Sequence, residues 1–279
     1  MNNAATGDSR PIGVFDSGIG GLSVLRAIRA ALPAEDLLYV ADSRFLPYGA
    51  KAREEVVERV FAISAFLVEQ GAKALVVACN TATAAGIAEL RASRRALPII
   101  GVEPAVKPAV AHSRSGTVGV LATSGTLQAE KFRRLVEQFA PQARIIIQGC
   151  PGLVERVEAG DFDGPVTRGL IREFTAPLLA RGVDTIVLGC THYPFLTGAI
   201  REVVGPGIAL FETGDAVARE LRRRLGEARL LRNGSRVGTE TFWTSGDPAT
   251  IAPLITRLWG TALPVHPLPT SGASVRVMS

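Results

Sequence analysis

Two of the three cysteines in this chain of 279 residues stand in matching sequence contexts. Cys79 and Cys190 each end a short apolar run and are followed by residues with amide, hydroxyl or imidazole side chains: Asn80, Thr81, Thr191 and His192. Such a run is typical of a strand that is buried on both faces of a parallel sheet, and the polar residues after it begin a helix. The positive end of a helix dipole lowers the pKa of a thiol and binds carboxylates. Both thiols are therefore candidate acid or base groups beside an anion site.

Two thiols that face one crevice can exchange a proton with a carbon atom held between them. One thiolate removes the proton as a general base, and the other thiol returns a proton to the opposite face as a general acid. Thiol pKa values are close enough to neutrality for both protonation states to be reached. This chemistry needs no metal, flavin or pyridoxal, so we expect no cofactor.

The third cysteine, Cys150, has no polar residue after it in Gly149-Cys150-Pro151-Gly152, and we interpret it as structural. An odd number of cysteines with no Cys-x-x-Cys pair argues against a disulfide framework and favours a reducing, cytoplasmic location. The histidines, cysteines and acidic residues show no zinc-ligand spacing, so we expect no metal site.

A glycine-rich turn, Asp16-Ser17-Gly18-Ile19-Gly20-Gly21, follows the first apolar run. Its glycines allow positive φ angles and close approach of an anion. The position where a dinucleotide-binding loop has its third glycine is Ser23, and no Lys follows as in a P-loop. A carboxylate at Asp16 is better suited to hold an ammonium group or to assist a proton transfer.

Three further features lie where expected strands end. We interpret Pro47-Tyr48-Gly49 either as a gate or backbone donor over the same crevice, or as an ordinary turn. Glu103 places a second carboxylate at a strand end. Of the three histidines, only His192 stands beside a candidate catalytic thiol.

The elements that must position these residues alternate along the chain. Strands are expected at residues 11–15, 37–41, 73–78, 98–102, 117–122, 143–148 and 184–188. Helices are expected at residues 20–32, 53–70, 83–91 and 104–112. This alternation predicts right-handed βαβ units in a doubly wound α/β fold. Ligands bind beyond the carboxyl ends of the strands in such folds, which is where the candidate residues lie.

Internal similarity predicts two lobes of similar design. Residues 12–18 resemble residues 118–124, and residues 76–81 resemble residues 187–192. We therefore expect two similar doubly wound parallel-sheet lobes with the active site in the cleft between them.

Charge and hydropathy exclude several partner classes. The net charge is +5, and the densest basic run is Arg222-Arg223-Arg224. No aromatic residue interrupts this run and it follows the polar face of an expected helix, so we interpret it as solvated and expect no nucleic-acid partner. No apolar run reaches the length of about 18 residues that a membrane span needs, and residues 1–10 show no secretory signal.

Taken in order, these motifs resemble the aspartate/glutamate racemase family, and the glutamate racemases of bacterial cell-wall synthesis in particular. The resemblance spans roughly residues 10–262 and rests on the turn at 16–21, Pro47-Tyr48-Gly49, Cys79-Asn80-Thr81-Ala82, Gly101-Val102-Glu103-Pro104, Gly189-Cys190-Thr191-His192-Tyr193-Pro194 and Thr244-Ser245-Gly246-Asp247-Pro248. It implies interconversion of L- and D-glutamate without a cofactor, and supply of D-glutamate for peptidoglycan and cell shape. A homodimer is also expected.

The resemblance also assigns roles to residues. It implies that Cys79 and Cys190 are the catalytic thiols, assisted by Asp16 and His192 respectively. It implies substrate contacts from Asp16, Ser17, Tyr48, Gly49, Asn80, Thr81, Thr191 and His192. Glu103 is a candidate for the polar network around His192.

The family fold implies a discontinuous first lobe, residues 10–104 with 217–265, and a second lobe, residues 105–216. Residues 266–279 are expected to form a mobile tail. His192 stands where aspartate racemases have an acidic residue, which favours glutamate over aspartate. The alternatives are an aspartate or hydantoin racemase of the same fold, or a two-lobed amino-acid-binding protein.

Overall fold

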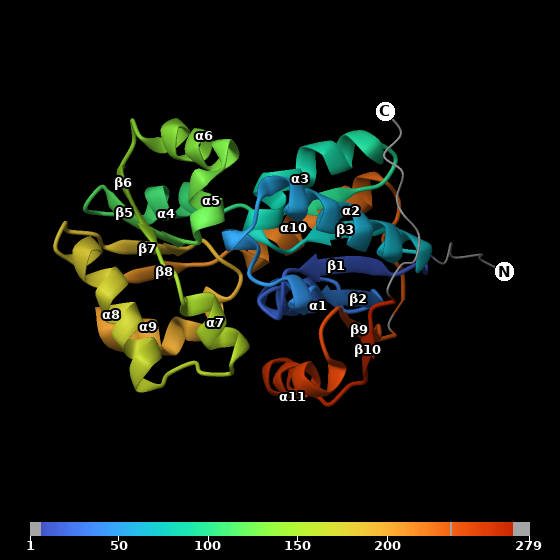
Figure 1. Cartoon of the computed structure of the whole chain (residues 1–279). Coiled ribbons are helices and arrows are strands. Elements are labelled where there is room, and N and C mark those ends of the chain that lie inside the picture. Colours follow the sequence, from blue (N-terminus) through green and yellow to red (C-terminus); the bar gives the residue numbers. More distant parts are fainter. Residues whose placement is uncertain (1–6, 235, 270–279) are drawn as a thin grey trace.

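The computed structural model describes residues 7–234 and 236–269, which form two α/β lobes side by side (Figure 1). The first lobe holds a six-stranded sheet in the order β10-β9-β2-β1-β3-β4. Its strands are β1 (Ile12–Asp16), β2 (Leu37–Ala41), β3 (Ala74–Val77), β4 (Ile99–Gly101), β9 (Glu240–Thr244) and β10 (Val265–Pro267). The second lobe holds a four-stranded sheet in the order β6-β5-β7-β8. Its strands are β5 (Thr117–Ala122), β6 (Arg144–Gly149), β7 (Thr185–Leu188) and β8 (Ala209–Phe211).

Every strand pair in both sheets is parallel, as the alternating pattern predicts. One face of the first sheet is covered by α1 (Leu22–Ala31), α10 (Gly214–Glu227) and α11 (Pro248–Trp259), and the other by α2 (Arg53–Glu69) and α3 (Asn80–Ser93). Along β1, Val14 packs into the first core and Phe15 into the second. Because both faces are buried, the strands read as continuous apolar runs and not as an alternation.

The second sheet is also covered on both faces. One face packs against α7 (Leu153–Glu158), α8 (Pro165–Leu179) and α9 (Thr197–Val204). The other packs against α4 (Val106–His112) and α6 (Glu130–Phe139). Shorter elements complete the described chain: η1 (Ser43–Phe45), η2 (Tyr48–Ala50), α5 (Ser124–Gln128) and η3 (Tyr193–Leu196). The architecture confirms the predicted fold class of two doubly wound lobes.

The last two strands return to the first sheet, since β9 pairs with β2 and β10 pairs with β9. We retain residues 10–104 with 217–265 and residues 105–216 as the proposed division into lobes. His266 and Pro267 belong to β10, so the expected boundary of the tail at residue 266 falls inside a strand. Residues 270–279 of that tail lie outside the described residues.

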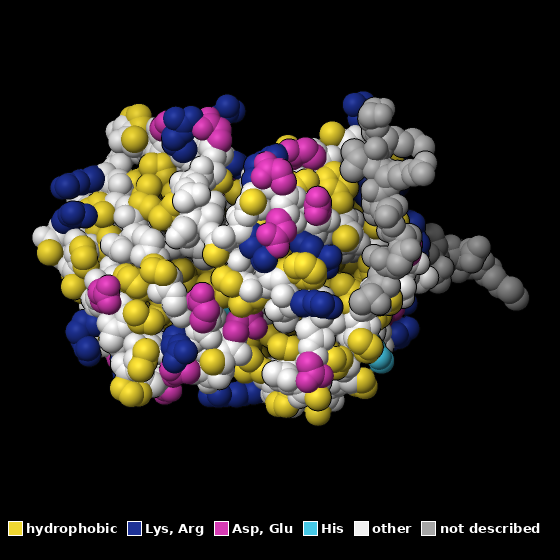
Figure 2. Space-filling model, in the orientation of Figure 1, with side chains coloured by type: hydrophobic (Ala, Val, Ile, Leu, Met, Phe, Trp, Pro, Cys, Tyr) yellow, Lys and Arg dark blue, Asp and Glu magenta, His cyan; other side chains and the backbone are white. Residues whose placement is uncertain are grey.

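Surface charges are mixed in sign. Figure 2 shows Lys and Arg side chains interspersed with Asp and Glu on the face it presents. The basic run of the sequence lies on α10, where Arg223 pairs with Glu220 and Glu227 of the same helix. Among the helices of residues 7–234 and 236–269, none is both long enough and apolar enough to cross a membrane.

A buried ion pair ties together four segments at the amino-terminal edge of the first sheet. Lys73 Nζ lies 2.6 Å from Glu35 Oε2, and both side chains are almost wholly buried. Lys73 also donates to the carbonyl of Asp8, and the other oxygen of Glu35 accepts from the backbone N–H of Arg232. Each charge is therefore satisfied only while these segments stay together.

Removal of one partner leaves an unpaired buried charge, which costs about 3–5 kcal/mol. We predict that Lys73→Ala lowers the free energy of unfolding in urea by about that amount. Lys131→Ala is the control, because Lys131 pairs with Glu103 at the exposed surface and should cost under about 1 kcal/mol. Equal losses in the two variants would contradict the role given to the buried pair.

Candidate active site

The carboxyl ends of β1, β3 and β7 meet at one small cavity between the lobes. Predicted residues line it on both sides: Ser17, Tyr48, Gly49, Cys79, Asn80 and Thr81 from the first lobe, and Cys190, Thr191 and His192 from the second. The structure adds Pro47, Thr123, Thr126 and Val154 to this lining. The cavity has a volume of about 20 Å³, which is room for about one water molecule. Both candidate thiols thus line one small cavity.

Cys79 is the N-cap of α3, and its Sγ accepts a hydrogen bond of 3.4 Å from the backbone N–H of Ala82. Burial raises the pKa of the Cys79 thiol, the charge of Asp16 raises it further, and the Ala82 N–H opposes them only in part. The expected lowering by the helix dipole is therefore outweighed, and the net direction predicted for Cys79 is wrong. These surroundings favour the thiol of Cys79 over its thiolate.

Asp16 lies behind the cavity wall and is fully buried. Its carboxylate accepts a 2.6 Å bond from the backbone N–H of Gly21 and a 3.2 Å bond from the Thr191 hydroxyl of the second lobe. Burial raises the pKa of Asp16, and the nearby charge of His192 opposes this shift. Asp16 therefore interacts with Cys79 in the first lobe and with Thr191 and His192, which follow Cys190, in the second.

Cys190 has a different neighbour, since its Sγ lies 3.7 Å from Nδ1 of His192. The other ring nitrogen, Nε2, lies 2.7 Å from Oε1 of Glu158. Burial lowers the pKa of His192, but the hydrogen bonds to Cys190 and Glu158 outweigh it and hold the pKa well above its ordinary value. The row Cys190–His192–Glu158 resembles a nucleophile–base–orienting-acid arrangement, with the imidazole able to exchange a proton with the thiol.

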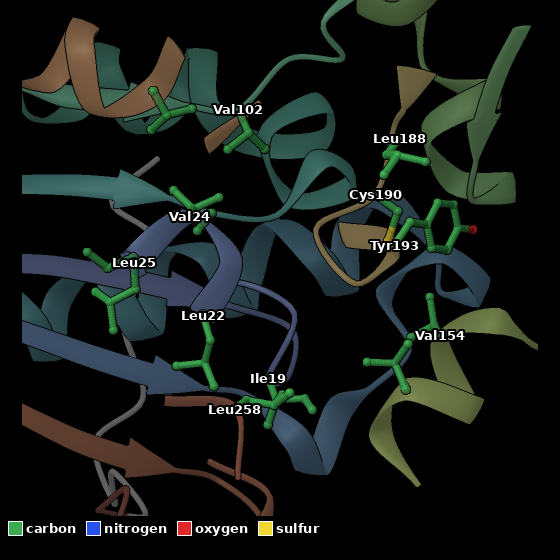
Figure 3. Close-up of a cluster of buried hydrophobic side chains, with 14 of the residues drawn as sticks. Ile19, Leu22, Val24, Leu25, Val102, Val154, Leu188, Cys190, Tyr193 and Leu258 are labelled. Atoms are coloured by element: carbon green, nitrogen blue, oxygen red, sulfur yellow. The ribbon is translucent and has the colours of Figure 1, made fainter. Parts of the chain in front are cut away.

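Glu158 also crosses between the lobes. The same Oε1 accepts a 2.8 Å hydrogen bond from the backbone N–H of Ile19. The hydrophobic core is continuous beneath this contact: one cluster extends from Ile19 and Leu22 to Val154, Leu188 and Tyr193 (Figure 3).

The carboxylate that binds His192 is Glu158, whereas the sequence suggested Glu103. Glu103 lies at the exposed surface, where its carboxylate pairs with Lys131 at 2.6 Å. Glu158 was missed because it lies at the end of a helix and not at the end of a strand. Its position could have revealed it. Glu158 follows Val154 by four residues and so lies on the buried face of α7, where a carboxylate needs a partner.

The glycines of the turn at residues 16–21 serve close packing. A Cβ on Gly18 would lie 2.0 Å from Oε1 of Glu158, and one on Gly20 would lie 2.3 Å from Nδ1 of His192. None of the three glycines of this turn is among the glycines with positive φ. The turn therefore does not use the positive φ angles that its glycines allow, and the space beside Gly18 and Gly20 is occupied by side chains of the second lobe.

Tyr48 lines the cavity, but its hydroxyl points elsewhere and donates a 2.5 Å hydrogen bond to Asp42. Asp42 also accepts two hydrogen bonds from Arg59. Cys150 is buried away from the cavity lining, and burial raises the pKa of its thiol to about 12. This agrees with the structural role expected of Cys150.

Asn80 has unused hydrogen-bonding capacity. Its side chain is almost fully buried, and within the part of the chain that the structure describes neither its amide nitrogen nor its amide oxygen has a partner. A buried amide without a partner is costly, which makes this side chain a candidate to bind a ligand. Over the same described residues, no three His, Cys, Asp or Glu side chains are grouped to hold a metal ion.

Comparison with known proteins gives a consistent result. Residues 12–221 match the model of the family described as Asp/Glu/Hydantoin racemase. The chain is 55% identical over 269 residues to the glutamate racemase of Methylococcus capsulatus, covering 96% of this chain and 99% of that protein. It is 53% identical over 253 residues to the glutamate racemase of Pseudomonas aeruginosa, covering 91% and 95%.

Solved structures agree with the sequence comparison. A glutamate racemase isoform from Bacillus anthracis superposes with a TM-score of 0.86 at 32% identity, covering 94% of this chain and 98% of that one. The Escherichia coli glutamate racemase, solved with L-glutamate and the activator UDP-MurNAc-ala, gives a TM-score of 0.81 at 32% identity, covering 92% and 97%. The chain therefore belongs to the Asp/Glu/Hydantoin racemase family.

Proposed function

We propose that this chain interconverts L- and D-glutamate without a cofactor, with Cys79 and Cys190 as the two acid–base groups. The observation that carries the proposal is that the two thiols, one from each lobe, line a single small cavity together with the Asn80 amide, which has no partner among the described residues. The relatives named glutamate racemase support glutamate as the substrate.

The reaction removes one proton from Cα and adds another proton to the opposite face of the same carbon. One sulfur, as thiolate, takes the Cα proton and the Cα–H electron pair stays on the substrate as a carbanion. The other sulfur, as thiol, gives its proton to the opposite face of Cα, and the configuration inverts. Each turnover thus leaves the thiols in exchanged protonation states, which the reverse reaction or exchange with solvent restores.

The surroundings of the two thiols suit these exchanged roles. Asp16 is placed to assist Cys79, and His192 is placed to exchange a proton with Cys190 at 3.7 Å. We assign Glu158 to positioning, because it fixes the imidazole through Nε2 and does not line the cavity.

The substrate contacts would come first from groups of the cavity wall that lack a partner within the described residues. The backbone N–H groups of Asn80 and Thr81 begin α3, where the first N–H groups of a helix have no intrahelical partner and attract carboxylates. The Asn80 amide supplies a further donor beside them. The hydroxyls of Ser17 and Thr191, which donate to the Asp16 carboxylate in this structure, would turn toward the substrate from the two sides of the cavity. The backbone of Tyr48 and Gly49 closes the cavity on the other side.

A cavity with room for one water molecule cannot hold an amino acid with two carboxylates. We infer that the lobes separate to admit the substrate and close again around it. Closure excludes water from the carbanion, which would otherwise be protonated on either face. D-glutamate made in this way would supply peptidoglycan synthesis.

The substrate is tested by circular dichroism of the purified native chain with L-glutamate and L-aspartate in turn. We expect racemisation of glutamate with a kcat/KM at least about tenfold above that for aspartate, because one methylene changes binding in a fitted cavity by about that factor or more. Faster turnover of aspartate would contradict the proposal, and binding of glutamate without turnover would favour an amino-acid-binding protein.

Replacement of either thiol should stop racemisation. We predict that Cys79→Ser and Cys190→Ser each lower kcat by about 10³-fold or more, since a hydroxyl is too weak an acid to replace a thiol. Cys150→Ala is the matched control and should keep kcat within about threefold of the native value. Normal racemisation by either serine variant would show that the mechanism is wrong.

Glu158→Gln keeps the shape of the side chain but removes the charge that helps to raise the pKa of His192. The imidazolium is present below the pKa of His192 and is lost as the pH rises through it. In the variant the pKa of His192 should be lower, so the fall of kcat/KM on the alkaline side should begin at a pH about one unit or more below that of the native enzyme. Glu155→Gln, on the exposed side of the same helix, should leave the profile in place. An unmoved profile in Glu158→Gln would argue against the role given to this carboxylate.

A further inference from the structure

The loop between β2 and α2, residues 42–52, is anchored on the side away from the cavity by three side chains that hydrogen-bond to one another: Asp42, Tyr48 and Arg59. Arg59 donates to both oxygens of Asp42, from Nε at 2.8 Å and from Nη2 at 2.9 Å. The Tyr48 hydroxyl donates to the same carboxylate at 2.5 Å. Asp42 is completely buried, and the Arg59 side chain is only 20% exposed. The carboxylate therefore has three strong hydrogen bonds and no access to water.

The front of this loop forms one wall of the cavity. A Cβ on Gly49 would lie 3.0 Å from Cβ of Thr123, and one on Gly125 would lie 3.0 Å from Cα of Gly49. The backbone of the loop thus touches the second lobe directly. A displacement of well under 1 Å at Gly49 would change both the shape of the cavity and the contact that closes it.

Regular secondary structure does little to hold the loop in place. Its two short 3-10 turns, η1 and η2, contribute few backbone hydrogen bonds, and Arg44 N–H donates to the hydroxyl of Ser245. The guanidinium of Arg59 also lies 3.9 Å from the centre of the Phe45 ring. Arg59 thus contacts the loop at Asp42 and at Phe45, while its own helix, α2, packs on the sheet.

We propose that Arg59 is a positioning residue for the substrate: through Asp42 and the Tyr48 hydroxyl, it sets the place of the Tyr48–Gly49 backbone at the cavity wall. This inference rests on the proposed function. The planar guanidinium fixes both the distance and the orientation of the carboxylate, which a lysine ammonium cannot do. Arg59 itself is absent from the cavity lining, so its effect on the substrate must pass through the loop.

The test uses Arg59→Lys and Tyr48→Phe in the full chain. A loosened wall weakens substrate binding, so KM for both enantiomers of glutamate should rise about tenfold in Arg59→Lys. A structural defect alone would lower the active fraction and leave KM unchanged. The two substitutions should also be non-additive in KM, because both act through Asp42.

Amide hydrogen exchange over residues 43–51 gives a readout that does not depend on activity. Arg59→Lys should speed this exchange about tenfold, since the anchor opposes local opening of the loop. The matched control is Arg29→Lys, because Arg29 makes a similarly buried ion pair with Glu240 in the same lobe. The control should leave both KM and the exchange of residues 43–51 within about twofold of the native values.

Unchanged exchange over residues 43–51 in Arg59→Lys and Tyr48→Phe would overturn the proposal. So would faster exchange with KM within about twofold of the native value. Failure of the native chain to racemise glutamate would count against the proposed function, and the exchange measurement would still decide whether Arg59 anchors the loop. If Arg59→Lys does not fold, Tyr48→Phe carries the test, because it removes one hydroxyl and keeps the ion pair.

Discussion

The rest of the site depends on the contacts of one carboxylate, that of Glu158, with His192 and with the backbone of Ile19. One oxygen accepts from the backbone of Ile19 in the first lobe and lies 2.7 Å from His192 in the second. The same contact therefore closes the lobes and holds the imidazole at Cys190. It also explains the glycines at positions 18 and 20, since a side chain at either would occupy the space of Glu158 or His192.

The two halves of the cavity are similar in fold but differ in electrostatics. Cys79 stands at the start of α3 near a buried carboxylate, while Cys190 stands beside an imidazole whose pKa is raised by its hydrogen bonds to Cys190 and to Glu158. Burial makes these interactions strong, because each charge is separated from water. Under the proposed mechanism, this asymmetry would give each thiol its own partner for gaining or losing a proton. The backbone differs as well, since α3 begins directly after Cys79 whereas a short 3-10 helix, η3, begins at Tyr193 after Cys190.

The sequence predicted the features that depend on local pattern. Continuous apolar runs predicted most of the strands, and polar residues at the strand ends marked Cys79, Asn80, Thr81, Cys190, Thr191 and His192, all of which line the cavity. The strands β8, β9 and β10 were missed, because β8 and β10 have only three residues each and β9 has polar residues around its two aromatic side chains. Glu158 and Arg59 were missed for a different reason, as their roles depend on contacts between distant segments. Glu103 shares the strand-end signal with the residues that line the cavity, yet its side chain lies at the surface and pairs with Lys131.

The central claim is that two different groups remove and return the Cα proton. The most direct test follows L-glutamate in D₂O with the purified native protein, by mass spectrometry and NMR at early times. Two exchangeable thiols predict that the first D-glutamate formed carries deuterium at Cα while the remaining L-glutamate keeps its proton. D-glutamate that retains the original proton, or L-glutamate that gains deuterium as fast as product forms, would mean that one group serves both faces and would contradict the account.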